Sequence, residues 1–555
     1  MINLMSELFK KETIIYYLLS VYLLIGVIIF KDFGIGIEEH FQRSSGFYWL
    51  NYLLQFTELE NLKNLVNDKV YEIKSLHPNL PPVDIAKHYG VVFDLPMALI
   101  EVVFNIDNSQ TQFYLRHLSN FIIFFVSGYL FYLIILKRTK IYSISIISCL
   151  FYLLSPRIFG NSFFDGKDLF FLSLITINFY FFISYTKKRS FSSILFFSLF
   201  CALSTSSRIM GLFFPIGFII LSIFQIINNK EYKKTIFELI LFIFLFFIFL
   251  YIHWPYLWTL QIFEFANFFQ SFKVAANPIV YFNGNYYVSE YLPQTYLPLW
   301  IVISTPEIII LTFVIGIIFF ISRLLNRFAS IKLSMLSNDL WRGKEEKTDF
   351  FIFLSLFQII IVYVSFSLNL YGGWRHFLFL HFFIIYFSAI GIYFVLLKLK
   401  NKLNLIRYFI IILSIFIFEI IFNLYKYHPF QSVYFNNLVS NGMKKNFEVD
   451  TQSLSRVEAI KDILRDSGKA NNITIGTASW TPLENGRSLI KKNYWYRLNF
   501  TGTSNKENVD YIYTNYYYEV NPLFANKYKI PDNFKLLKTL TIDNTHVYSI
   551  YKKNH

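Results

Sequence analysis

Two neighbouring carboxylates begin the first polar segment of the chain. Glu38 and Glu39 follow an apolar run at residues 13–30, and His40 and Arg43 come shortly after them. Because adjacent carboxylates repel each other, a site beside a lipid bilayer can raise the pKa of one of them toward that of a general base. The competing interpretation is an ordinary group of solvated charges at a membrane surface.

Three further groups of polar residues lie beside apolar segments. A carboxylate and an arginine together could hold a substrate and its phosphate, and the planar guanidinium suits a lipid-linked phosphate or pyrophosphate. The groups are Asp94 with Arg116; Arg157, Asp165, Lys167 and Asp168; and Arg375 with His376. Each alone could be a surface salt bridge, so the interpretation depends on whether the chain brings them to one face.

The composition identifies the elements that carry these groups as membrane helices. The chain has 555 residues, of which 55% are hydrophobic and 21% aromatic, and a soluble core cannot bury that much apolar surface. Its apolar runs predict about eleven transmembrane helices. They cover residues 13–30, 119–136, 141–154, 169–184, 191–206, 210–227, 235–252, 302–321, 351–367, 377–397 and 407–424. Cys149 and Cys201 lie within or beside these runs, so no disulfide framework is indicated.

The chain has a formal net charge of +15, and its basic residues lie mainly between the apolar runs. There they orient the helices in the membrane and do not indicate nucleic acid as a partner. Basic residues gather in alternate loops, such as residues 187–189, whereas the intervening short loops hold few. The positive-inside rule therefore predicts a multi-pass protein of the cytoplasmic membrane, with its N-terminus in the cytoplasm and its C-terminus outside. Residues 31–118, residues 253–301 and the tail then lie outside.

All four polar groups fall on this outer face in the predicted topology. Charged side chains beside a bilayer are costly to bury and are therefore functional candidates. We predict one outward-facing cavity next to the membrane that contains Glu38, Arg157 and Arg375.

The composition changes near residue 428, which predicts two domains. Residues 1–427 form an all-α transmembrane domain, and residues 428–555 form a small extracytoplasmic α/β domain. In that domain an amphipathic helix is predicted at 453–467, and short strands at 473–476, 509–514 and 545–551.

The motifs, in this order, resemble those of the GT-C superfamily of membrane glycosyltransferases, in the branch of the protein O-mannosyltransferases and the lipid A aminoarabinose transferase. That branch has an acidic pair after the first helix, usually Asp-Glu followed by His-Phe, and here a glutamate replaces the aspartate. The matching segments are Glu38-Glu39-His40-Phe41, Phe93-Asp94-Leu95-Pro96, Tyr114-Leu115-Arg116, Ser155-Pro156-Arg157 with Asp165 and Asp168, and Ser207-Arg208. The likeness covers roughly residues 10–380.

The resemblance implies an inverting transfer of a sugar from a polyprenyl-phosphate carrier to a glycan, lipid or protein acceptor outside the membrane. It makes Glu38 or Glu39 the general base, and Asp94 a second acidic group that orients the acceptor or a divalent metal. Arg116, Arg157 and Arg375 are candidates for phosphate contacts. The other substrate-binding candidates are His40, Asp165, Lys167, Asp168, Arg208 and His376. No Gly-rich nucleotide loop is apparent, which fits a lipid-linked donor.

Two alternatives remain open at this point. A secondary transporter also has many spans and charge within the membrane, but transporters tend to show two related halves, which are not visible here. A GT-C-like scaffold that has lost activity could still bind a lipid carrier or a partner protein.

Overall fold

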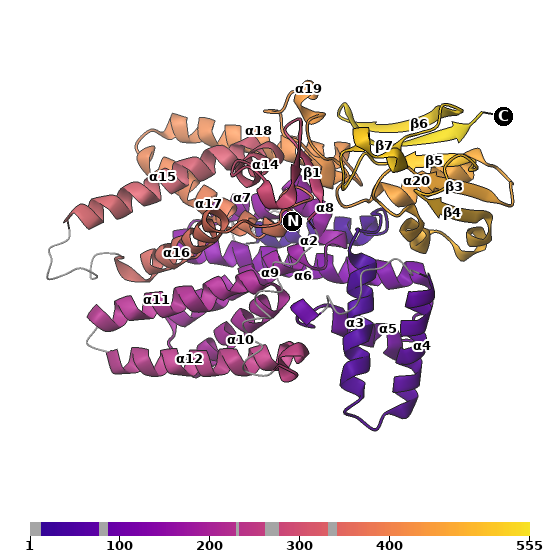
Figure 1. Cartoon of the computed structure of the whole chain (residues 1–555). Coiled ribbons are helices and arrows are strands. Elements are labelled where there is room, and N and C mark those ends of the chain that lie inside the picture. The colour runs from indigo at the N-terminus through magenta and orange to yellow at the C-terminus, as the bar shows by residue number, and fades with distance from the viewer. Residues whose placement is uncertain (1–12, 77–86, 229–231, 261–276, 331–340, 555) are drawn as a thin grey trace, which may run out of the picture.

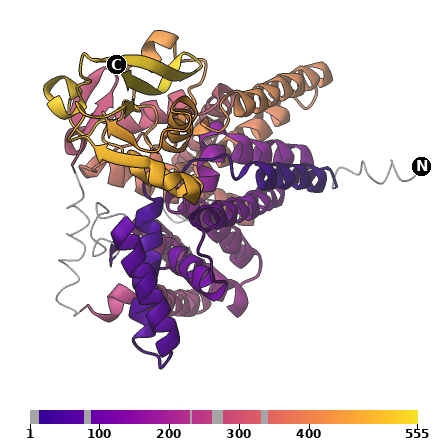
Figure 2. The ribbon, with the colours of Figure 1, turned by 90° about the vertical axis from the view of Figure 1, so that its right-hand side faces the viewer.

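The structure, a computed structural model, describes residues 13–76, 87–228, 232–260, 277–330 and 341–554. Long helices make up most of it, and a small sheet domain at the C-terminal side packs at one end of the helix bundle (Figure 1). When the molecule is turned by 90°, this domain lies above the helices of the first large segment (Figure 2).

A helix forms in every apolar run that the sequence predicts to span. The helices are α2 (Ile14–Ile29), α6 (Ser109–Thr139), α7 (Tyr142–Leu154), α9 (Asp168–Lys187), α10 (Phe191–Ser207), α11 (Phe213–Asn228), α12 (Tyr232–His253), α15 (Glu307–Ser330), α16 (Gly343–Ser365), α17 (Leu380–Lys398) and α18 (Leu403–Lys426). Helices are expected here because backbone polar groups within lipid must bond to one another.

Within the described residues, eight of the helices are long and apolar enough to cross a membrane. The bent pair of α7 and α8 (Pro156–Phe164) brings the number to nine when it is counted as one span. Helices α2 and α10 are apolar but shorter, with 16 and 17 residues. The apolar helices indicate a multi-pass membrane protein, whereas the count of eleven spans stays a prediction.

Helix α8 differs from the polar loop that the sequence indicates at residues 155–168. Ser155 has extended backbone angles, as expected before a proline, and Pro156 begins α8, where its missing N–H costs nothing. The two helices meet at 59°, and every residue of α8 is buried. Only residues 165–167 are left to connect α8 with α9.

The first large segment forms a helical unit beside the bundle. It consists of α3 (Glu39–Leu54), α4 (Glu60–Leu76) and α5 (Asp94–Val103). Phe47 and Leu50 of α3, Val66 of α4 and Ala98 of α5 form its apolar core. A side chain at Gly46 would come within 2.3 Å of the Asp94 carbonyl oxygen, so this glycine permits the close contact of α3 with the start of α5.

A β-hairpin and a short helix α14 (Tyr296–Ser304) lie between α12 and α15. Strands β1 (Ile279–Phe282) and β2 (Asn285–Val288) are antiparallel. Asn283 and Gly284 join them with φ of 50° and 82°, values that a tight hairpin turn requires and that Asn and Gly tolerate best. Phe282 forms an isolated antiparallel β-bridge with Phe447, so the hairpin contacts the C-terminal part of the chain.

In the described part of the C-terminal domain, five strands form a mixed sheet in the order β4-β3-β5-β7-β6, and helix α20 (Ser455–Asp466) packs against it. The strands are β3 (Ile473–Thr477), β4 (Leu498–Gly502), β5 (Tyr511–Thr514), β6 (Phe534–Ile542) and β7 (Thr545–Lys553). The predicted helix and three strands are confirmed. The sequence analysis missed β4 and β6, the two edge strands, whose lower burial weakens the alternation of polar and apolar residues.

The C-terminal domain is attached to the first polar segment by hydrogen bonds. The buried guanidinium of Arg456 donates to the carbonyl oxygens of Ile35, at 2.8 Å, and Gly36, at 3.2 Å. Ser109, at the start of α6, donates to the carbonyl oxygen of Ser488 at 2.8 Å. These contacts fix the backbone immediately before Glu38.

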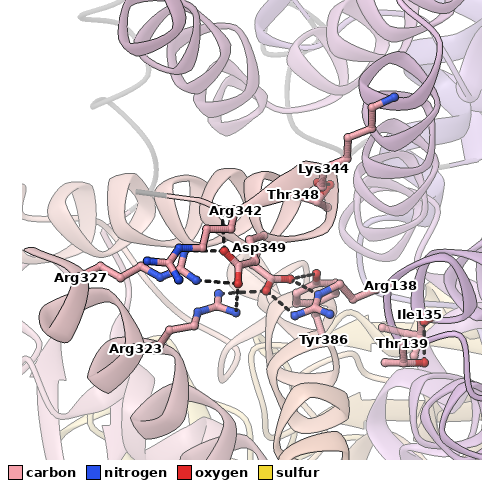
Figure 3. A network of polar contacts seen from close by, with 11 residues as sticks. Ile135, Arg138, Thr139, Arg323, Arg327, Arg342, Lys344, Thr348, Asp349 and Tyr386 are labelled. Atoms are coloured by element: carbon pink, nitrogen blue, oxygen red, sulfur yellow. Dashed lines mark hydrogen bonds and ion pairs between the residues drawn. The ribbon is translucent and has the colours of Figure 1, made fainter. Parts of the chain in front are cut away.

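A buried group of charged and polar side chains, which we call the Asp349 cluster, lies toward the C-terminal end of α6 (Figure 3). It comprises Arg138, Arg323, Arg327, Glu346, Asp349 and Tyr386. The Asp349 carboxylate accepts two hydrogen bonds from Arg138, at 2.6 and 2.7 Å, one from Arg323 at 3.0 Å and one from the Tyr386 hydroxyl at 2.7 Å. Glu346 is held by Arg327. The cluster joins α6, α15, α16 and α17.

Candidate active site

Glu38 lies at the meeting point of three segments that are far apart in the sequence. Its carboxylate receives a hydrogen bond from Arg375 Nη2 at 2.5 Å and another from Lys167 Nζ at 3.3 Å. Glu38 precedes α3, Lys167 precedes α9, and Arg375 belongs to the short helix η7 (Arg375–Phe377). We call the group around it the Glu38 cluster; it comprises Glu38, Asp165, Lys167, Asp168, Arg208, Arg375 and His376.

The turn between α8 and α9 presents Lys167 to this cluster. Asp165 Oδ1 accepts hydrogen bonds from the backbone N–H groups of Lys167, at 3.3 Å, and Asp168, at 2.8 Å. Asp168 in turn forms an ion pair with Arg208. The ammonium of Lys167 also lies 3.7 Å from the centre of the Tyr89 ring. The turn is therefore held by its own side chains.

Two glycines shape the approach to Arg375. Gly372 and Gly373 have φ of 68° and 70°, a region that disfavours other residues. A side chain at Gly372 would approach Arg375 Cδ to 3.1 Å. The guanidinium of Arg375 lies 4.7 Å from the centre of the Tyr371 ring and packs over the face of that ring.

The carboxylates of the cluster have divergent acidities. Burial by itself would raise the pKa of Glu38, but the charges of Arg375 and Lys167 outweigh burial and hold that pKa well below its usual range. Burial, with the nearby negative charge of Glu38, raises the pKa of Asp165 to about 6. Burial and the charge of Arg375 hold the pKa of His376 well below its usual value, so its imidazole stays neutral.

Several polar atoms of the cluster are buried without a partner. Among the described residues these include Arg375 Nε, Arg208 Nε, Asp165 Oδ2 and His376 Nδ1. A buried donor or acceptor left unpaired costs about 1–3 kcal/mol, so a native site keeps such atoms for a reason, such as a ligand or water. Glu38, Asp165, Asp168 and Arg375 line a small pocket here.

Asp94 lines a small adjoining pocket, which Lys167 and Tyr89 also line. Arg116 Nη1 donates to Asp94 at 3.2 Å, and its Nε donates to Glu101 at 3.2 Å. Glu101 is 1% exposed and also accepts a bond from Arg43 at 2.9 Å. Burial raises the pKa of Asp94 to about 6, although Arg116 opposes that rise.

Glu39 and His40 have surroundings different from those of Glu38. Glu39 accepts a hydrogen bond from the Gly36 backbone N–H at 2.6 Å and lies 3.2 Å from His117 Nε2. His40 Nε2 lies 3.0 Å from the carbonyl oxygen of Asn485, in the C-terminal domain. Both side chains thus connect the first polar segment to neighbouring elements.

Arg157 lies behind the glycine turn and outside the set of residues that line the Glu38 pocket. Its Nε donates to the Tyr434 carbonyl oxygen at 2.9 Å, and its guanidinium is 4.9 Å from the centre of the Trp300 ring. A Cβ atom at Gly373 would be 3.7 Å from Arg157 Nη1. The predicted proximity of Glu38 and Arg375 is confirmed as direct contact, with Arg157 as a neighbour across the turn.

Sequence analysis missed Glu101, which pairs with two arginines, and Tyr89, which covers Lys167. A signal for Glu101 was present, since a carboxylate within the apolar stretch of helix α5 that follows Asp94 is costly unless it is paired. Tyr89 carried no such signal, because tyrosines are frequent throughout the chain.

The described residues do not gather three His, Cys, Asp or Glu side chains in a way that could hold a metal ion. In the Glu38 cluster the carboxylates are instead paired with cationic side chains or backbone N–H groups. The residues present therefore do not fit a divalent ion in this arrangement.

Comparisons with known proteins give a likeness of fold. No protein-family model matches the chain, and no curated protein sequence matches it. Among solved structures, the oligosaccharyltransferase of Archaeoglobus fulgidus in its apo form is similar, with a TM-score of 0.50 and 10% sequence identity over 92% of this chain and 70% of that one. The chain therefore has a fold similar to that of this oligosaccharyltransferase. The GT-C superfamily and its particular branch stay predictions.

Proposed function

We propose that the protein is a membrane glycosyltransferase that moves a sugar from a polyprenyl-phosphate carrier to an acceptor on the outer side of the cytoplasmic membrane. The observation that carries the proposal is the Glu38 cluster, in which a carboxylate lies between Arg375 and Lys167 and nearby buried polar atoms lack partners. The fold supports it, since the similar structure is that of an oligosaccharyltransferase.

The proposed reaction is an inverting displacement at the anomeric carbon of the sugar. A lone pair of the acceptor oxygen forms the new bond to this carbon, and the bond between the carbon and the phosphate oxygen breaks. The electron pair of the broken bond leaves with polyprenyl phosphate. The acceptor's proton passes to a carboxylate, and nearby cations stabilise the departing phosphate.

Glu38 is the carboxylate that we propose as the base. While it is bound to Arg375 and Lys167, its pKa is too low for efficient proton abstraction at neutral pH. A donor phosphate would compete for the same two cations and release the carboxylate, whose pKa would then rise. Donor binding and activation of the base are thereby coupled. Glu39 is the weaker candidate because His117 and the Gly36 N–H already hold it.

The phosphate contacts also differ from those implied by the family resemblance. Arg116 is engaged with Asp94 and Glu101, so we propose it as a brace for the Asp94 pocket. Arg116, Arg157, Arg208 and Arg375 each keep a buried nitrogen without a hydrogen-bond partner in the described structure. Of these four, Arg208 and Arg375 belong to the Glu38 cluster, and we propose them, with Lys167, as the phosphate contacts.

Glu38→Gln tests the role of the base, because it removes the proton acceptor and keeps nearly the same shape. Single-turnover transfer from polyprenyl-phosphate sugars, measured in nanodiscs, should fall by roughly 10²- to 10⁴-fold. Donor binding should not weaken, because the variant removes a competitor of the donor phosphate for Arg375 and Lys167. Glu72→Gln, on the surface of α4, is the matched control and should leave transfer unchanged.

Full transfer activity in both Glu38→Gln and Asp165→Asn would exclude the cluster as the source of the base. A wild-type preparation that transfers sugar from no polyprenyl-phosphate donor would overturn the proposed activity and favour the inactive scaffold.

The proposed orientation has its own test in intact cells. Cysteines placed at Asn505 and at Ser337, a position outside the described residues, should react with an impermeant thiol reagent from opposite sides of the membrane. The natural Cys149 and Cys201 are buried, so the background should be low. Equal labelling at both positions would refute an outside C-terminal domain.

A further inference from the structure

A second and larger cavity lies between the β1–β2 hairpin and the C-terminal domain. Its volume is about 380 Å³, near the lower end of the range for small-molecule sites. Tyr281 and Tyr286 line it from the hairpin, and Tyr516 and Tyr518 line it from the loop after β5. None of the residues that line this cavity belongs to the Glu38 cluster.

The tyrosines give the cavity apolar ring faces with hydroxyl groups at their edges. The rings of Tyr281 and Tyr286 are 4.8 Å apart between centres and tilted by 38°, and both are partly exposed. Such a surface suits a ligand that has apolar C–H faces and a polar rim, because the ring supplies contact area while the hydroxyl supplies a hydrogen bond.

Two polar groups of the cavity wall are buried and lack a partner. The Glu448 side chain accepts a hydrogen bond from the Tyr281 backbone N–H at 3.0 Å through Oε1, while its Oε2 has no partner among the described residues. Thr545 Oγ1 is likewise buried without a partner within the described structure. Both residues are 4% exposed. A ligand with several hydroxyl groups would satisfy both.

The cavity offers an anionic ligand no buried cation that lacks a partner among the described residues. Lys444, a lining residue, is held by Asp543, with 2.5 Å between its Nζ and the carboxylate oxygen. Lys445 is exposed at the cavity edge, where water screens its charge. Burial raises the pKa of Glu448 to about 8, so near neutral pH its carboxyl group is largely uncharged and can both donate and accept hydrogen bonds. A neutral ligand with many hydroxyl groups fits these features.

The cavity is close to the Glu38 cluster. Tyr517, which lies between two lining tyrosines in the sequence, is buried and interacts electrostatically with Glu448, Arg375 and Glu38. Phe447, also in the cavity wall, is 5.2 Å from Trp300 between ring centres, and Trp300 stacks with Arg157. Tyr517 and the contacts of Phe447 with Trp300 therefore link the cavity wall to the surroundings of the charged site.

We propose that this cavity binds a neutral oligosaccharide through the tyrosine faces and the carboxyl of Glu448. As a consequence that rests on the proposed function, the bound oligosaccharide is the glycan portion of the acceptor, held beside the transfer site.

The test measures sugar binding to the full-length protein in nanodiscs without any donor. Maltotriose, mannotriose and the trisaccharide of N-acetylglucosamine serve as probes in saturation-transfer NMR and calorimetry. At least one should bind saturably. Glu448→Gln should weaken that binding about tenfold, because the amide cannot reproduce the donor and acceptor pattern of the buried carboxyl group and leaves a polar atom badly paired. Tyr286→Ala should weaken it to a similar degree, whereas Tyr496→Ala, an exposed tyrosine of the same domain, should not.

Tyr286→Ala keeps the test independent of any folding defect in the buried Glu448→Gln variant, because Tyr286 is only partly buried. Binding of none of the three trisaccharides would overturn the proposal. The same result follows if a bound sugar keeps its affinity in both cavity variants, or if only a Ser/Thr-rich peptide binds there. Because no donor is present, sugar binding without any detectable transfer would support this cavity and count against the proposed function alone.

Discussion

The Asp349 cluster and the Glu38 cluster are both buried groups of charge, but they are completed in different ways. They lie toward opposite ends of α6. Arg138 of the Asp349 cluster is roughly 33 Å along the helix, at 1.5 Å per residue, from Arg116, whose partner Asp94 shares a pocket with Lys167 of the Glu38 cluster. Asp349 is fully buried and has four hydrogen bonds from three side chains. Within the described residues, no side-chain atom of the Asp349 cluster is buried without a partner, whereas the Glu38 cluster has several.

The difference indicates what each cluster is for. A buried charge is tolerated when it is fully paired, and a complete set of partners leaves nothing for a ligand to do. The Asp349 cluster therefore fastens α16 to α6, α15 and α17. The Glu38 cluster is incomplete by itself, which is the property expected of a site that waits for a charged substrate.

The largest expected effect is on stability, from Asp349→Asn. Removing this charge leaves Arg138, which is 11% exposed, without its counter-charge and takes one of two carboxylate partners from Arg323, which should cost about 3–5 kcal/mol of unfolding free energy. Glu38→Gln should cost at most about 1 kcal/mol, because the Glu38 side chain is 26% exposed and solvent screens its pairs. Unfolding of both variants in the same detergent provides the comparison.

Glu345→Gln is the matched control, because Glu345 precedes Glu346 of the Asp349 cluster on the same helix but is 38% exposed in a loose pair with Lys140. Its effect should stay within about 0.5 kcal/mol. Equal losses in Asp349→Asn and Glu38→Gln would remove the distinction between the two clusters.

The sequence predicts the helices of this fold well, because lipid leaves an apolar run little choice but to bond to its own backbone. Pairing within the sites is a different matter. Glu38 bonds to Lys167 and Arg375, which are 129 and 337 residues away in the chain, and no local pattern specifies such a contact. The sequence could name these residues as candidates, but it could not separate Glu38 from Glu39.

Helix α8 shows the same limit at the level of secondary structure. The charges at residues 157–168 indicate a loop, yet Ile158, Phe159 and Phe163 pack in the core and Pro156 starts a helix. The local sequence is compatible with either a loop or a helix here, and tertiary packing favours the helix.

A smaller effect is expected from the pH dependence of Asp165. Its folded pKa of about 6 lies above the ordinary value of 3.8. Its contribution to stability is thus fully present below about pH 4 and is lost as pH rises through 6. Asp165→Asn cannot titrate, so the unfolding free energy of the variant should rise relative to that of the wild type between pH 4 and 7. At about 1.4 kcal/mol per pKa unit the gain is roughly 2–3 kcal/mol.

Unfolding midpoints of the two proteins from pH 4 to 8 measure this difference. Glu38 loses its ion pairs in acid in both proteins, so its effect largely cancels. Asp68→Asn, at an exposed position of α4, controls for the loss of a carboxylate in general. A difference between wild type and Asp165→Asn that does not change with pH would contradict the assignment.

The smallest expected effect concerns competition between Glu38 and an anion. If the Glu38 carboxylate occupies the cations that a phosphate needs, Glu38→Gln frees Arg375 and Lys167, and inorganic pyrophosphate should bind about tenfold more tightly. Because a ligand stabilises the state it binds by mass action, saturating pyrophosphate should stabilise Glu38→Gln by about 1.4 kcal/mol more than it stabilises the wild type.

Sodium chloride at matched ionic strength corrects for general screening. Asp349→Asn should respond to pyrophosphate as the wild type does, since the Asp349 cluster is far from the Glu38 cluster. Equal shifts in wild type and Glu38→Gln would show that Glu38 does not hold these cations against a phosphate, and the proposed coupling between donor binding and activation of the base would then fail.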